Sequence, residues 1–126
     1  MEEKTLRVQQ MEALEELNNY LKKLLPAVEA IIIELRGDKK ADTDELFTAI
    51  INGINWTIEV LNRTMDIVNE NGEIIDKESI NYAINEFSFA IREHNDLNKA
   101  DVLEKSILPF LLTVESRVSV VTNHVN

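Results

Sequence analysis

The chain has 126 residues, of which 44% are hydrophobic, with three glycines, two prolines, no cysteine and a formal net charge of −10. A chain of this length buries one sizeable core, which predicts a single domain over residues 1–126. The acidic balance repels phosphate backbones and anionic lipid headgroups, which argues against nucleic acid and membrane partners, and the lack of cysteine excludes disulfides and thiolate zinc sites.

The first predicted helix covers residues 5–36. Its apolar side chains recur at steps of three and four, the spacing that buries one helix face. They are Leu14, Leu17, Leu21, Leu24, Val28, Ile31 and Leu35. Gly37 follows in the position where a left-handed residue closes a helix. Pro26 predicts a kink that frees the Lys22 carbonyl, although a separate helix starting at Pro26, with Leu25 as a poor N-cap, is an alternative.

The second predicted helix, residues 43–70, has two apolar faces. Asp42 and Glu45 form a capping pair at its start, and Asn71-Gly72 ends it. One apolar stripe has the spacing of a core face: Phe47, Ile50, Ile54, Ile58, Leu61, Met65 and Val68. A second stripe lies on roughly the opposite side: Ala49, Gly53, Trp56, Val60 and Ile67. A helix of a small bundle needs one apolar face, so the second indicates a partner, a second copy or a central position.

Two further helices are predicted over residues 77–94 and 98–122, capped by Asp76 and Asn98. The third helix has the inner face Ile80, Ala83, Ile84, Phe87, Ala90 and Ile91. The fourth has the core stripe Leu103, Ile107, Phe110, Leu111, Val114, Val118 and Val121. The valine-rich segment 118–122 is the one place where a strand competes with the helix.

Short loops between long helices favour antiparallel neighbours, so the expected fold is all-α, an up-down-up-down four-helix bundle. Pro109 predicts a kink in the fourth helix that frees the Lys105 carbonyl, as Pro26 does in the first. At 1.5 Å per residue both prolines lie about 15 Å from the same end of the bundle. The kinks predict either complementary bends or a small gap that accepts a ligand.

Catalytic and metal-binding patterns were sought without success. A di-metal helical bundle needs Glu-x-x-His pairs, and neither histidine has a glutamate three residues before it. The structural interpretation of His94 is a cation that complements the C-terminus of the third helix. No serine has a base at a suitable spacing, and three isolated glycines make no phosphate loop. We therefore expect no catalytic residue, no metal and no cofactor.

The third helix, like the second, has apolar side chains outside its core face. Tyr82 and Phe89 are seven residues apart and project away from the inner face of the third helix. If the two helices fold back at Gly72, the extra stripes merge into one exposed patch, which marks an interface. The predicted partner or dimer interface is Trp56, Val60, Ile67, Tyr82 and Phe89. The competing interpretation is that the second helix packs centrally.

The fourth helix carries the segments Ala100-Asp101-Val102-Leu103-Glu104 and Ile107-Leu108-Pro109-Phe110-Leu111. This Ala-Asp-x-Leu-Glu pattern, followed by a proline flanked by leucines, resembles the last helix of a family of small uncharacterised helical proteins of Gram-positive bacteria. The segment Leu24-Leu25-Pro26 and the stretch from Ile51 to Trp56 are similar to its earlier helices. The resemblance implies a helical fold and no known activity.

The N-terminal residues lack the basic start and apolar run of a signal peptide, and no apolar run approaches the roughly 20 residues that cross a bilayer. The expected location is the cytoplasm. The expected function is a non-enzymatic protein-interaction module, for example an adaptor or chaperone for an amphipathic bacterial segment, with a protein partner or a second copy bound at the predicted interface. The alternative is a ligand-binding or enzymatic bundle with its site near Pro26 and Pro109.

Overall fold

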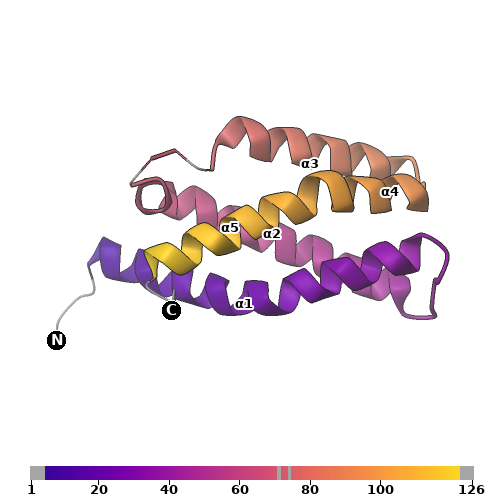
Figure 1. Ribbon diagram of the computed structural model, residues 1–126, viewed down its shortest axis with the longest axis horizontal. Coiled ribbons are helices and arrows are strands. Elements are labelled where there is room, and N and C mark those ends of the chain that lie inside the picture. Colours follow the sequence, from indigo (N-terminus) through magenta and orange to yellow (C-terminus); the bar gives the residue numbers. More distant parts are fainter. Residues whose placement is uncertain (1–4, 71, 74, 123–126) are drawn as a thin grey trace.

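The computed structural model describes residues 5–70, 72–73 and 75–122. This part of the chain is an all-α four-helix bundle without strands (Figure 1). The first three helices are α1 (Leu6–Leu35), α2 (Thr43–Val68) and α3 (Lys77–Arg92). The fourth is continuous and consists of α4 (Asp96–Val102), the π-helix η1 (Leu103–Ile107) and α5 (Leu108–Val121). The segment 118–121 therefore continues the helix rather than forming a strand.

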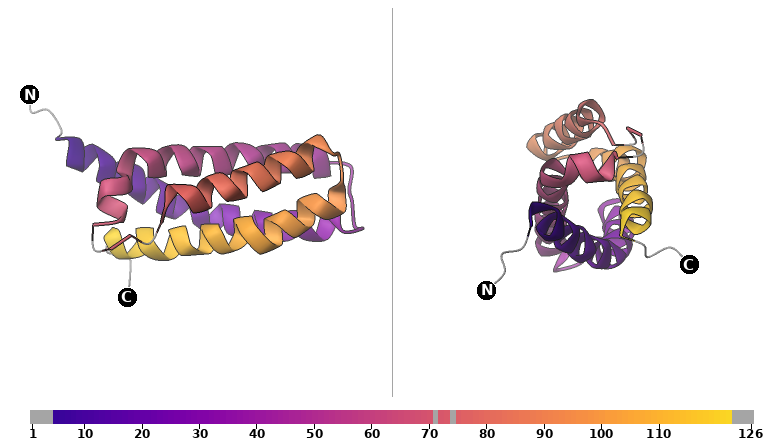
Figure 2. Two further views of the ribbon diagram at one scale, coloured as in Figure 1. Left: turned by 90° about the horizontal axis from the view of Figure 1, so that it is seen from above. Right: turned by 90° about the vertical axis from the view of Figure 1, so that its left-hand side faces the viewer.

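Hydrogen bonds between side chains show how the helices are aligned. Gln10, near the start of α1, donates to Asp66 near the end of α2 at 3.1 Å. Ser119, late in α5, donates to Asn18 in α1 at 2.9 Å. Each contact joins the beginning of one helix to the end of another, so α1 runs opposite to both neighbours (Figures 1 and 2).

The core contains the apolar stripes that the spacing predicts on all four helices. Leu14, Leu17 and Leu21 of α1 are fully buried, as are Leu103 and Leu111 of the fourth helix. Burial of one leucine side chain contributes about 1.5–3 kcal/mol, so these rows supply most of the driving force for assembly.

The central position of α2 accounts for its second apolar stripe. It packs against α1 and α5, and Phe47 meets Phe87 of α3 edge-to-face with ring centroids 5.7 Å apart. With these neighbours, α2 buries much of the second stripe: Val60 is 4% exposed and Ile67 is 1% exposed, whereas Trp56 is half-buried and Ala49 is exposed. The prediction that Val60 and Ile67 face outward is wrong, because the periodicity of one helix does not reveal how many neighbours surround it.

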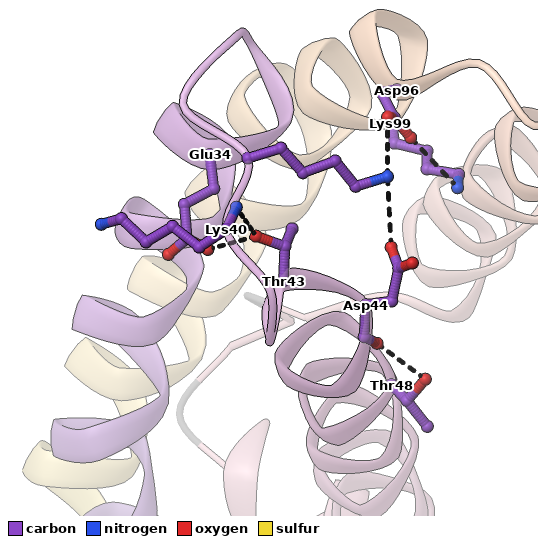
Figure 3. A network of polar contacts seen from close by, with 8 residues as sticks. Glu34, Lys40, Thr43, Asp44, Thr48, Asp96 and Lys99 are labelled. Atoms are coloured by element: carbon purple, nitrogen blue, oxygen red, sulfur yellow. Dashed lines mark hydrogen bonds and ion pairs between the residues drawn. The ribbon is translucent and has the colours of Figure 1, made fainter.

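The α1–α2 turn is held by Thr43 rather than by the predicted Asp42 capping pair. Asp42 occupies the N-cap position but forms no capping hydrogen bond with its side chain. The Thr43 hydroxyl instead donates to Glu34 at 2.6 Å and accepts from the Lys40 amide at 2.7 Å (Figure 3). Gly37 has a φ of +142°, which confirms the prediction that a left-handed residue follows α1.

A kink in α2 falls at Thr64, where the sequence has no proline. Thr64 has a φ of −125° and a ψ of 15°, and its hydroxyl donates to the Val60 carbonyl at 2.8 Å. The buried Gln10 side chain donates to the Arg63 carbonyl at 2.8 Å, beside the kink. Insertion of a side chain into the backbone ladder is a recognised cause of helix bending. The end of α2 consequently turns across the end of the bundle toward α5 (Figure 2).

The ends of α3 and the start of α4 differ in part from the predictions. Asp76 caps α3 by accepting from the Ser79 amide at 2.7 Å, as expected. The cap of α4 is Asn95, which accepts from the Asn98 amide at 3.0 Å, so the helix begins at Asp96 and the predicted Asn98 cap is wrong. His94 lies beyond the C-terminal end of α3 with a φ of 55°, the left-handed position that usually holds glycine. The predicted stop at Asn71 lies outside the described residues.

The two prolines occupy different helical environments. α1 continues through Pro26 from Leu6 to Leu35, so the alternative of a separate helix starting at Pro26 is wrong. Before Pro109 the chain forms η1, in which the Leu108 amide bonds to the Leu103 carbonyl, five residues back. Pro109 has no amide hydrogen to donate, and a wider turn accommodates its ring.

Candidate functional site

An open groove of about 1310 Å³ separates the first half of α3 from α5 and the bent end of α2. We call it the α3–α5 groove. Its walls come from the end of α2, the following loop, α3, η1 and α5. α3 packs against α4 and η1, and it diverges from α5 toward the α2–α3 turn (Figure 1). The kink at Thr64 turns α2 toward α5 and so closes one end of this space.

The floor of the groove is largely apolar and its rim is acidic. The apolar lining residues are Met65, Ile75, Ala83, Pro109 and Phe110. The acidic lining residues are Asp66, Glu73, Asp76 and Glu78, and Lys77 is the one basic residue among those that line the groove. An apolar floor inside a charged rim is the arrangement that binds an amphipathic segment of another protein.

A hydrogen bond joins η1 to α3 beside Tyr82, which forms part of one wall of the groove. Ser106 of η1 donates to Glu86 of α3 at 3.0 Å, and the Tyr82 phenol bonds to the same carboxylate. Hydrogen bonding to the Glu86 carboxylate raises the pKa of Tyr82. Tyr82 is 64% exposed and lines the groove. The bond between Ser106 and Glu86 therefore links η1 to the part of α3 that carries Tyr82.

A second hollow of about 470 Å³ continues this surface along α5. It is lined by Leu112, Thr113, Ser116, Arg117 and Val120, and it shares Thr113 with the α3–α5 groove. Leu112 and Val120 are about half exposed, at 48% and 50%. The outer side of α5 therefore presents apolar side chains that no other described helix covers.

The five predicted interface residues do not form one patch. Trp56 is half-buried and packs edge-to-face on Tyr20 of α1, with ring centroids 5.4 Å apart. Val60 and Ile67 lie in the core, whereas Tyr82 and Phe89 are exposed. Tyr82 lines the groove, and Phe89, two helical turns further on, extends the same side of α3. The merged patch is wrong, and the exposed part of the prediction is confined to α3.

Two clusters of ion pairs connect the helices at the end of the bundle that holds the α1–α2 turn. Arg36 at the end of α1 binds Glu104 at 2.8 Å and Asp101 at 3.0 Å, and these hydrogen bonds raise the pKa of the guanidinium and lower the pKa of Glu104. Lys39 joins Asp96 and Asp44 at 3.2 and 3.3 Å, which raises the pKa of the Lys39 ammonium. Together the two clusters connect the α1–α2 turn to α4 and η1.

The described residues hold no group of three histidine, aspartate or glutamate side chains placed to bind a metal ion. Within the same ranges, no helix combines the length and the apolar content that crossing a membrane requires.

Sequence reasoning missed the groove because its walls come from segments far apart in the chain. One local signal was present: Leu103, Ile107 and Leu111 are separated by two successive steps of four, and all three are buried. Two such steps drift by about 80° around an ideal α-helix. The wider turn of η1 keeps them on the core side. Leu17, Leu21 and Leu25 have the same spacing directly before Pro26 and lie in the regular helix α1, so this signal is not specific to a π-helical turn.

The chain matches the family described as Domain of unknown function (DUF8042) over residues 12–116. It belongs to this family. No curated protein and no solved structure matches the chain. The residues matched to DUF8042 include all those that line the α3–α5 groove, so the groove lies within the family domain.

Proposed function

We propose that this chain is a non-enzymatic interaction module, an adaptor or chaperone, that binds an amphipathic helical segment of another protein in the α3–α5 groove. The observation that carries the proposal is the groove itself, an open space of about 1310 Å³ with an apolar floor between α3 and α5. Sites for small molecules are clefts or cavities of about 300–1,000 Å³, so this groove is larger than most of them. A helix laid along a groove fills a larger and more open space.

The exposed apolar side chains along the groove support this proposal. Tyr82 lies on one wall, and Leu112 and Val120 extend the surface along α5. Residues 106–120 span about 21 Å at 1.5 Å per residue, which is the length of a helical segment of four turns. A partner helix would pack side by side with α5, as α1 does on another face of α5.

The alternative of a ligand site between the two prolines receives no support from the groove. Pro109 lines it, but no residue of α1 does, so Pro26 does not contribute. We place the module in the cytoplasm of a Gram-positive bacterium, in keeping with the resemblance of its last helix to a protein family of such bacteria.

A substitution that fills the groove tests the proposal. The exposed Thr113 lines the groove, and Thr113→Trp places an indole in it without altering a buried side chain. Thr48→Trp is a matched control, because Thr48 is also exposed on a helix and its hydroxyl also bonds to the carbonyl four residues back. The ligand is an 18-residue amphipathic helical peptide with a leucine and alanine face and a glutamine face.

We expect titration calorimetry to show that the wild-type chain and Thr48→Trp bind this peptide, and that Thr113→Trp loses at least ten-fold in affinity. Equal affinity in all three proteins, or no binding to the wild-type chain, refutes the groove as a helix-binding site.

A further inference from the structure

We infer that the partner segment is a basic amphipathic helix, with lysine or arginine side chains that meet the acidic rim of the α3–α5 groove. This inference rests on the proposed function and adds the chemistry of the partner. It follows from the distribution of charge around the groove and from which of those charges are already neutralised inside the protein.

The rim has an excess of carboxylates. Among the residues that line the groove, Asp66, Glu73, Asp76 and Glu78 are acidic and Lys77 alone is basic. Asp66 accepts a hydrogen bond from Gln10, and Asp76 accepts two from Ser79 as the cap of α3. These contacts orient the two aspartates but do not neutralise their charge.

Glu73 and Glu78 remain available to a partner. Both are exposed, and neither forms an ion pair within the part of the chain that the structure describes. They flank Asp76 at the α2–α3 turn, so three carboxylates from one short segment face the same end of the groove. A cation that docks here gains several partners at once, while an anion meets repulsion.

The net charge of −10 acts in the same direction over a longer range. It attracts a basic segment and accelerates its association. A second copy of this chain would bring another acidic rim against this one, and repulsion between like charges disfavours that arrangement. Charge complementarity therefore selects a basic protein segment over a dimer.

Three matched peptides test the inference. Each has 18 residues and the same leucine and alanine face, and the polar face carries lysine, glutamine or glutamate. Titration calorimetry at low salt is expected to rank the lysine peptide at least ten-fold above the glutamine peptide and to show no binding of the glutamate peptide. At about 0.5 M salt the advantage of lysine should shrink, since screening shortens the range of these charges to a few ångströms.

Rim variants separate local charge from the overall charge. Glu73→Gln with Glu78→Gln should weaken binding of the lysine peptide by roughly two- to ten-fold and leave the glutamine peptide unchanged. Glu29→Gln with Glu45→Gln is the matched control, because it removes the same charge at exposed positions on α1 and α2 that do not line the groove. The control should change neither affinity by more than about two-fold.

The outcomes distinguish this inference from the proposed function. If the glutamine peptide binds, Thr113→Trp blocks it and lysine gives no advantage, the groove is a helix-binding site and the basic partner is refuted. If both double variants weaken the lysine peptide equally, the attraction belongs to the whole surface and the inference also fails. If no peptide binds and Thr113→Trp instead converts a dimer to a monomer in light scattering, the occupant is a second copy and both statements are wrong.

Discussion

Replacement of Gly53 by alanine tests the close approach of α1 and α2. A methyl group at this position would overlap the hydroxyl of Tyr20 and lie 3.0 Å from its ring carbon Cζ and 3.2 Å from Cδ1 of Leu24. The Tyr20 ring would have to move, and it packs edge-to-face on Trp56. The substitution therefore sets a gain in helix propensity against a loss of packing between the two helices.

The magnitudes predict which effect is larger. Glycine to alanine inside a helix stabilises by about 1 kcal/mol. Overpacking a contact costs about 1–3 kcal/mol, and loss of an edge-to-face aromatic pair costs about 0.5–1.5 kcal/mol. The expected net effect of Gly53→Ala is a loss of about 2 kcal/mol in the free energy of unfolding. In a Tyr20→Leu background the overlap with Tyr20 is absent and the Leu24 side chain has to move only slightly, so the same substitution should stabilise by up to about 1 kcal/mol.

Urea unfolding measured by circular dichroism, and by the fluorescence of Trp56 as the one tryptophan in the chain, gives all four free energies of this cycle. Tyr20→Leu alone is the reference for the second pair. Gly53→Ala that stabilises the wild-type chain by the full 1 kcal/mol would show that Tyr20 does not pack on Gly53, and the close contact of α1 with α2 would then be wrong.

Three further predictions concern the core, one helix end and the response to acid. The Nδ2 atom of buried Asn18 has no hydrogen-bond partner among the described residues, and its Oδ1 atom accepts from Ser119. Asn18→Leu combined with Ser119→Ala should therefore raise the free energy of unfolding by about 1–3 kcal/mol in urea titrations. A lower free energy of unfolding would indicate that the Asn18 amide has a partner. His94 has a φ of 55°, so His94→Gly should stabilise the chain and His94→Val should destabilise it, by about 1 kcal/mol each, in thermal melts. Equal shifts in the melting temperature of the two variants would argue against the left-handed conformation. Hydrogen bonds from Arg36 lower the pKa of Glu104 in the folded chain, so this contribution to stability is present above the ordinary glutamate pKa of about 4.3 and is lost as pH falls through the lowered value. The stability difference between the wild-type chain and Arg36→Met should accordingly disappear on acidification, and a difference that persists at pH 2 would exclude this ion pair as its cause.

The sequence predicted the helices well because their signals are local. The three-and-four spacing of leucines in α1 and the cap at Asp76 each depend on residues within a turn or two, and the structure has both. The cap of α4 was assigned to Asn98 rather than Asn95 because several polar residues in this segment can accept from a nearby amide. Which of these polar residues becomes the cap depends on the backbone conformation of the preceding turn.

The candidate site depended on the relations between helices, which periodicity does not contain. Nothing in the spacing of α2 shows that it packs against α1 and α5 and touches α3 through Phe47, so Val60 and Ile67 looked exposed. Beside the bend at Thr64, the Arg63 carbonyl accepts a hydrogen bond from Gln10, which is 53 residues earlier than Arg63 in the chain. The groove then arises because the bent end of α2 meets α5 while α3 diverges from it.

The sequence by itself determined the fold class, the number of helices and the main apolar row of each helix, because each segment separately carries hydrophobic residues at helical spacing. It also determined the excess negative charge. Only the tertiary structure decided which apolar side chains remained exposed and where carboxylates gathered around them. Exposure is a property of neighbours, and the neighbours of Tyr82 and Glu73 come from helices that pack together only after the chain has folded.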